Sequence, residues 1–136
     1  MPHTYVVGVS GKAGSLRALA YAAGLARRHA GRLVVVHAGG RPERFALWPE
    51  TVLLARTASA DTADELRRTI AQTLADDDLD WALRTEAGAA FAVLVRVAGL
   101  EHADAVVVGT SRRRVIRRSL AARLTTLGRH PVIAVP

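Results

Sequence analysis

Residues Ala103–Gly128 read ADAVVVGTSRRRVIRRSLAARLTTLG, and the pattern of this stretch decides the fold. It opens with a short apolar run, Ala105–Val108, turns at Gly109–Ser111, and continues with apolar residues at helical spacing. A buried strand, a turn of small residues and a helix are how many α/β folds present backbone N–H groups to an anion. Arginines follow the turn here in place of further glycines, so the stretch predicts an anion site that has been altered.

Length and composition limit the class of protein. A chain of 136 residues can bury a proper core, and we expect one domain over residues 1–136. The absence of cysteine excludes disulfides and thiolate metal sites. The five histidines have no metal-binding spacing, so we expect no metal, and we expect His37 to be packed and hydrogen-bonded. Because there is no long apolar run and no signal-like start, we expect a cytoplasmic protein with no membrane partner.

The positive charge of the chain is unevenly placed. The net charge is +7, yet residues 1–104 carry twelve basic and twelve acidic side chains. The whole excess lies in residues 105–136, which carry seven arginines and no acidic residue. A localised charge of this kind indicates an anionic partner more directly than a basic isoelectric point does.

Five strands are expected to alternate with four helices along the chain. The strands are compact apolar or alternating runs: Tyr5–Val9, Leu33–Val36, Trp81–Glu86, Ala105–Val108 and Val132–Val135. Right-handed crossovers between such strands predict a single α/β domain with a doubly wound, Rossmann-like parallel sheet. The expected strand order is 3-2-1-4-5, with helices on both faces of the sheet and the fourth strand inside it.

The helix ends are predicted from small and polar residues. Ser15 is expected to cap the first helix, and Gly31 to end it in the left-handed conformation. The last helix is defined by Ile116, Leu120, Leu124 and Leu127, with Gly128 as its C-terminal cap. This pattern predicts that the last helix follows the Gly109 turn directly and carries arginines at its start.

A ligand crevice is expected at the carboxyl ends of the strands, where the strand order reverses. The candidate ligand-binding residues follow the first, second and fourth strands or lie on the last helix: Val9, Ser10, Ala38, Val108, Gly109, Thr110, Arg112, Ala122 and Arg123.

Two segments together resemble the universal stress protein family. The first is Val6–Gly11 followed by Ser15, Ala18 and Leu19, and the second is Ala103–Thr110 followed by Arg117 and Arg118 and closed by Pro131–Val135. The resemblance covers the whole chain in order. It implies a stress-linked binding or regulatory module that forms a homodimer through the last strand, at Val132, Ile133, Ala134 and Val135.

The resemblance also implies a phosphate-binding motif, which this chain matches poorly. Nucleotide-binding members carry a glycine, two residues, a second glycine, nine residues and a third glycine followed by serine or threonine. Only Gly109 fits this motif, because the second glycine position is Arg112, the third is Ala122 and the hydroxyl position is Arg123. Such members also carry an acidic residue after the first strand, and this chain has Ser10 at that position. An arginine side chain fills space that a phosphate would use, and in a left-handed turn it costs about 1 kcal/mol. These changes predict that ordinary ATP binding is lost.

The arginines allow three interpretations. The plainest is a solvated helix face, which Arg114, Arg117 and Arg118 would form. In the second, Arg112 and Arg123 hold a phosphate or a small acidic metabolite through their side chains. The third is nucleic-acid binding, which is not expected because no aromatic residues are interleaved with the basic ones.

The leading functional hypothesis is therefore a non-catalytic, homodimeric binding or regulatory module of the universal stress protein type without ordinary ATP binding and without a cofactor. No residue is a plausible catalytic base, so no catalytic residues are assigned. One alternative is ATP or another adenine nucleotide bound in a modified, arginine-containing phosphate site. The other alternative is a different small anionic ligand.

Overall fold

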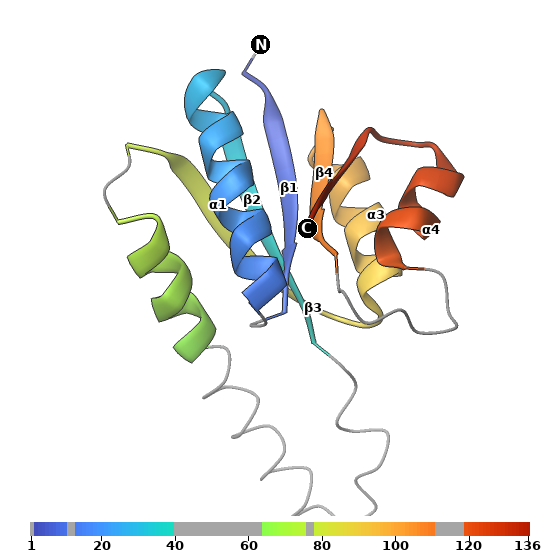
Figure 1. Ribbon diagram of the computed structural model, residues 1–136, viewed down its shortest axis with the longest axis horizontal. Helices are drawn as coiled ribbons and strands as arrows, with labels where there is room; N and C mark the ends of the chain where they lie inside the picture. The colour runs from blue at the N-terminus through green and yellow to red at the C-terminus, as the bar shows by residue number, and fades with distance from the viewer. Residues whose placement is uncertain (1, 11–12, 40–63, 76–77, 111–118) are drawn as a thin grey trace, which may run out of the picture.

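The protein is built on a five-stranded parallel sheet, seen in the computed structural model, which describes residues 2–10, 13–39, 64–75, 78–110 and 119–136 (Figure 1). The strands are β1 (Thr4–Val9), β2 (Arg32–Gly39), β3 (Asp80–Ala87), β4 (Ala105–Gly109) and β5 (Val132–Val135). Their order is β3-β2-β1-β4-β5, and every neighbouring pair is parallel. The predicted fold class and strand order are confirmed.

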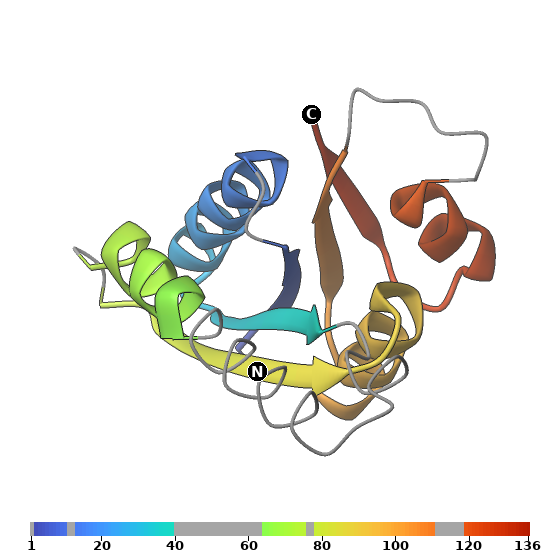
Figure 2. The ribbon, with the colours of Figure 1, turned by 90° about the horizontal axis from the view of Figure 1, so that it is seen from below.

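Helices cover both faces of the sheet (Figure 2). On one face lie α1 (Ala13–Arg28) and the helical residues 64–73, which pack on the sheet through Leu66 and Ile70. On the other face lie α3 (Ala90–Leu100) and α4 (Leu120–Leu127). The sheet is therefore the middle of three layers, as a doubly wound fold requires.

The central strands explain why both layers form. Val7 on β1 stands beside Val35 on β2 and Val107 on β4, and all three face α1 with no exposed surface. One residue earlier, Val6, Val34 and Val106 form the equivalent row toward α3. Successive side chains of a strand point to opposite faces, so an unbroken valine run supplies both cores. Each buried valine contributes roughly 1.5–3 kcal/mol.

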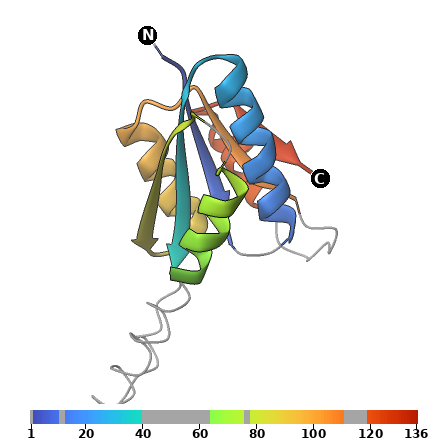
Figure 3. The same cartoon turned by 90° about the vertical axis from the view of Figure 1, so that its left-hand side faces the viewer.

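The strand directions place the ligand-accessible edge of the sheet. The arrows of β1, β2 and β3 point the same way in Figure 3, so their carboxyl ends meet at one edge. The helices α1, α3 and α4 each begin at this edge, because each follows the carboxyl end of a strand in the chain.

The end of α1 differs from the prediction. Ala30 has the left-handed backbone (φ 49°), and Gly31 does not. A Cβ atom on Gly31 would lie 2.6 Å from the carbonyl oxygen of His3, so Gly31 is needed for a close backbone approach. Gly128 has φ 69° and caps α4, as predicted.

The start of α4 also differs from the prediction. Ser119 is extended (φ −59°, ψ 156°), and its Oγ accepts a hydrogen bond from the Ala122 backbone N–H. The described helix α4 therefore begins at Leu120, with Ser119 as its N-terminal cap. Residues 111–118 lie outside the described residues, and with them the predicted helical residue Ile116 and the arginines Arg112, Arg113, Arg114, Arg117 and Arg118.

The left-handed Ala30 generates a stability prediction. Replacing Ala30 with Gly should raise the free energy of unfolding by about 0.5–1 kcal/mol. The left-handed conformation costs an L-residue about 1–2 kcal/mol, which glycine avoids, but glycine loses more conformational entropy than alanine on folding and so keeps only part of this advantage. The neighbouring exchange Gly31→Ala is the control and should destabilise the protein, since its Cβ meets backbone. Urea denaturation of the three proteins measures both effects. A lower midpoint for Ala30→Gly than for the wild type would contradict this account.

Candidate functional site

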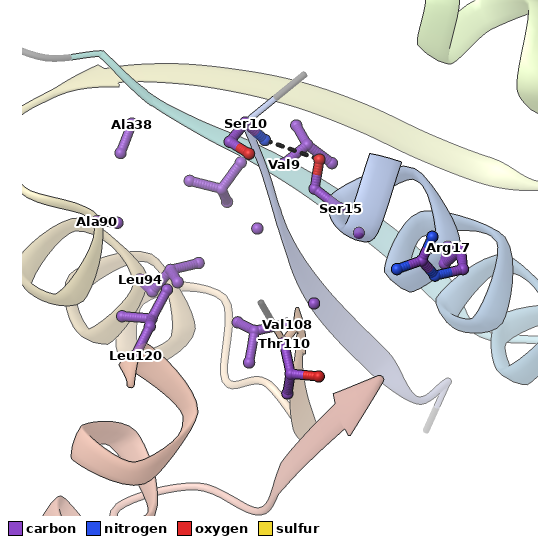
Figure 4. A pocket seen from close by; sticks show the side chains of 14 residues that line it. Val9, Ser10, Ser15, Arg17, Ala38, Ala90, Leu94, Val108, Thr110 and Leu120 are labelled. Atoms are coloured by element: carbon purple, nitrogen blue, oxygen red, sulfur yellow. Dashed lines mark hydrogen bonds between the residues drawn. The ribbon is translucent and has the colours of Figure 1, made fainter. Parts of the chain in front are cut away.

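A cavity of about 590 Å³ lies at the carboxyl edge of the sheet (Figure 4). Its volume is within the range of about 300–1,000 Å³ that is usual for small-molecule sites. The described residues that line it come from the ends of β1, β2 and β4 and from the first residues of α1, α3 and α4. The cavity therefore occupies the crevice that the strand order predicts.

Six of the predicted site residues line this cavity: Val9, Ser10, Ala38, Val108, Gly109 and Thr110. Ala122 and Arg123 are not among its lining residues. Arg112 lies outside the described residues. The fold thus brings together the residues at the strand ends and separates them from the two on α4.

Arg123 has a different partner from the one predicted. Its guanidinium carbon lies 4.3 Å from the centre of the Phe91 ring, so the side chain stacks on α3. The predicted approach of Arg123 to the crevice is corrected: its guanidinium packs on the Phe91 ring, and it is not among the described lining residues. Arg123 lies in the first turn of α4, which is capped by the hydroxyl of Ser119.

Gly109 has a packing role that is independent of any ligand. A Cβ atom at this position would lie 2.4 Å from the carbonyl oxygen of Gly14 and 3.1 Å from the backbone nitrogen of Ser15. The end of β4 and the first turn of α1 therefore meet backbone against backbone. Only glycine allows this approach, and it holds one wall of the cavity in place.

Two hydrogen bonds fix the end of β1 beside the cavity. The Ser10 backbone N–H donates to the Oγ of the buried Ser15 at 3.1 Å. The Nδ1–H of His37 donates to the carbonyl oxygen of Val9 at 3.2 Å, which confirms that His37 is hydrogen-bonded. Ser15 lies inside the first turn of α1 and so joins that turn to β1, whereas the sequence predicted it as the residue before the helix.

The helix ends around the cavity favour negative charge. The first turns of α1, α3 and α4 carry no acidic side chain, and Ala89, the residue before α3, forms no capping bond through its side chain. Unneutralised helix N-termini carry partial positive charge and bind anions. Glu86, near the carboxyl end of β3, is held at 3.1 Å by Arg84 and at 3.0 Å by Arg96. No acidic side chain lines the cavity among the residues that the structure describes.

Sequence reasoning missed Arg17, which lines the cavity from α1. Its Nε–H donates to the carbonyl oxygen of Pro136 at 2.9 Å. The spacing of the sequence could have placed Arg17 at the cavity, because Arg17 follows Gly14 by three residues and so lies on the same side of the helix. The apolar lining residues Val36, Ala90, Leu94 and Leu120 were also missed, because each looks like an ordinary core residue in the sequence.

The described residues contain no group of three or more histidine, cysteine or acidic side chains that could hold a metal ion. None of the described helices is both long enough and apolar enough to cross a membrane.

The parallel sheet and the cavity at its carboxyl edge place the protein in the Rossmann-like α/β class. Within that class, the chain belongs to the universal stress protein family, whose model matches residues 1–136. A comparison with curated proteins finds no match.

Solved structures with the same fold include several universal stress proteins. One, solved in complex with cAMP, has 24% sequence identity and a TM-score of 0.77, and the match covers 98% of this chain and 97% of that one. UspA from Lactobacillus plantarum has 18% identity and a TM-score of 0.78, with 98% and 97% covered. The protein from Archaeoglobus fulgidus in complex with dAMP has 22% identity and a TM-score of 0.70, with 98% of each chain covered.

The contact between Gly109 and Gly14 generates a second prediction. Replacing Gly109 with Ala should lower the free energy of unfolding by about 1–3 kcal/mol, because the new Cβ meets backbone that cannot move aside cheaply. Gly99→Ala is the matched control: its Cβ meets nothing within 4 Å, and alanine should stabilise α3 by up to about 1 kcal/mol. Thermal and urea denaturation measure both, and equal stabilities of the two variants would refute the contact.

Proposed function

We propose that this protein is a non-catalytic, homodimeric binding module of the cytoplasm, and that its cavity takes an adenine nucleotide with a single phosphate group. Its role is regulatory, through occupancy of the site in the stress response. ATP bound in the ordinary way is not its ligand.

The observation that carries the proposal is the cavity itself, around which the first turns of three helices carry no acidic side chain. Its two ends differ in character. Figure 4 places Ala38, Ala90 and Leu94 toward one end and Thr110 and Arg17 toward the other. A ligand with an apolar ring at one end and an anion at the other matches both. The universal stress proteins solved with cAMP and with dAMP support this choice of ligand class.

The sequence argues against a triphosphate. The positions that would be the second and third glycines of a phosphate loop are Arg112 and Ala122, so the sequence lacks the glycines that let backbone N–H groups approach a triphosphate. Two alternatives remain as outcomes of the test below: ATP in a modified site with arginine contacts, and an anion that is not a nucleotide.

The proposal of a non-catalytic role rests on the chemistry of the lining. The described lining residues include two serines, a threonine and an arginine but no carboxylate or imidazole that could act as a general base.

Ligand-dependent melting tests the proposed function. At a 100-fold excess over the dissociation constant, a ligand stabilises the folded state by about 2.7 kcal/mol, so AMP or cAMP should raise Tm by several degrees and ATP by less. Ala38→Phe, which fills the cavity, should abolish the shift. Ala20→Phe, at an exposed position on α1, should leave it unchanged. A larger shift with ATP than with AMP would favour the modified ATP site, and equal shifts with inorganic phosphate and AMP would favour a non-nucleotide anion.

The proposed dimer forms through the free edge of β5. The carbonyl oxygens of Pro131 and Val135 accept hydrogen bonds from β4, through Val106 and Thr110. Backbone groups alternate along a strand, so the N–H and C=O groups of Val132 and Ala134 face away from β4. An edge of this kind pairs readily with a second copy.

Removing one outward donor tests the dimer. Ala134→Pro deletes an N–H on the free edge while the bonds of β5 to β4 stay, and proline is tolerated on edge strands. The wild type should sediment as a dimer and this variant as a monomer with unchanged circular dichroism. Ala134→Val keeps the N–H and should stay dimeric. A wild-type protein that sediments as a monomer well above micromolar concentration would rule the dimer out.

A further inference from the structure

We propose that Arg17 selects the ligand of this cavity by its negative charge, so that the site takes a phosphorylated nucleoside in preference to the neutral nucleoside. This inference rests on the proposed function and adds to it the residue that recognises the phosphate. The arginines that the sequence places after the Gly109 turn are not needed for it.

The guanidinium of Arg17 is oriented toward the cavity. Its Nε–H is fixed by the 2.9 Å hydrogen bond to the Pro136 carbonyl oxygen, and the two terminal amino groups take no part in that bond. A Cβ atom added to Gly14 would lie 3.7 Å from Nη2, so the guanidinium folds back over the first turn of α1. Gly14 is itself a lining residue and touches the end of β4. Nη2 therefore lies close to Gly14, on the side of α1 that meets the end of β4.

The surroundings of Arg17 leave its terminal amino groups available to an anion. Arg17 is the charged side chain among the described lining residues, and no acidic lining residue neutralises it. The hydrogen bond to Pro136 uses only the Nε–H, so the two terminal amino groups of Arg17 can still donate to an anion. Beside an N-terminal helix turn, a cation is disfavoured by about 0.3–1 kcal/mol, and an anion bound there removes that cost.

The position of Arg17 matches one end of the proposed ligand. Arg17 and Thr110 lie apart from Ala38 and Ala90 in Figure 4, and all four line the same cavity. A nucleoside whose ring packs against the apolar end directs its phosphate toward the other end. The Thr110 hydroxyl lies at that end and donates to the Val135 carbonyl oxygen at 3.3 Å. It is neutral, so it supplies no positive charge to a phosphate. Arg17 then supplies the charge that recognises the phosphate.

The test compares the binding of AMP and adenosine by isothermal titration calorimetry in four proteins. These are the wild type, Arg17→Met, Arg17→Lys and the control Arg67→Met, which removes the same charge from an exposed position outside the lining. Arg17→Met should weaken AMP binding about tenfold or more and leave adenosine binding unchanged, as expected for one charge-assisted contact. Arg17→Lys should restore most of the AMP affinity, and Arg67→Met should match the wild type. Wild-type AMP affinity should fall with added salt, and less so in Arg17→Met.

Distinct results overturn the two proposals. If the wild type binds adenosine and AMP with equal affinity, or if Arg17→Met weakens both ligands equally, the charge selection by Arg17 is refuted while the nucleotide site stands. If the wild type binds neither ligand, the proposed function fails and this inference fails with it. If Arg17→Met does not fold, the comparison of AMP with adenosine in Arg17→Lys and the salt dependence of the wild type decide the question.

Discussion

The contact on which the site depends is the backbone approach between the end of β4 and the first turn of α1. The distance of 2.4 Å between a hypothetical Gly109 Cβ and the Gly14 oxygen means that no side chain separates the two elements. Next to this contact, Ser15 accepts a hydrogen bond from the backbone of Ser10, and Arg17 donates one to a main-chain oxygen of Pro136. The backbone packing that forms one wall of the cavity thus depends on the absence of a single Cβ atom.

This contact changes the meaning of the one glycine that fits the phosphate-binding pattern. Gly109 is required by the packing of α1 whether or not an anion binds, so its presence is no evidence for a phosphate loop. The case for an anion rests instead on the helix ends, where the first turns of α1, α3 and α4 lack acidic residues around one cavity. That case does not depend on the positions of the later glycines.

The fold was largely predictable from the sequence because the relevant signals are local. The valine runs, with their periodicity and their flanking turns, define the strands, and the handedness of crossovers leaves few topologies. The strand-end residues of the site follow from the same pattern, which therefore predicts Val9, Ala38 and Thr110. The predicted helix ends were less accurate, because a helix end depends on what approaches it in space. Gly31 is needed because the His3 carbonyl passes by, and no local pattern shows that contact.

The charges show why the rest of the site could not be predicted. Residues 105–136 hold the whole excess of positive charge, so the charge pattern of the sequence predicts an anion site there. Of those arginines, Arg123 makes a cation–π contact with the Phe91 ring, an attraction worth about 0.5–1 kcal/mol at an exposed site. The arginine that lines the cavity, Arg17, comes from the electrically balanced part of the chain. An anion responds to charges within a few ångströms much more strongly than to distant ones, since salt screens exposed charges beyond about 8–10 Å. The local field at the cavity is therefore determined by which helix turns face it, and the net charge of a segment does not predict that field.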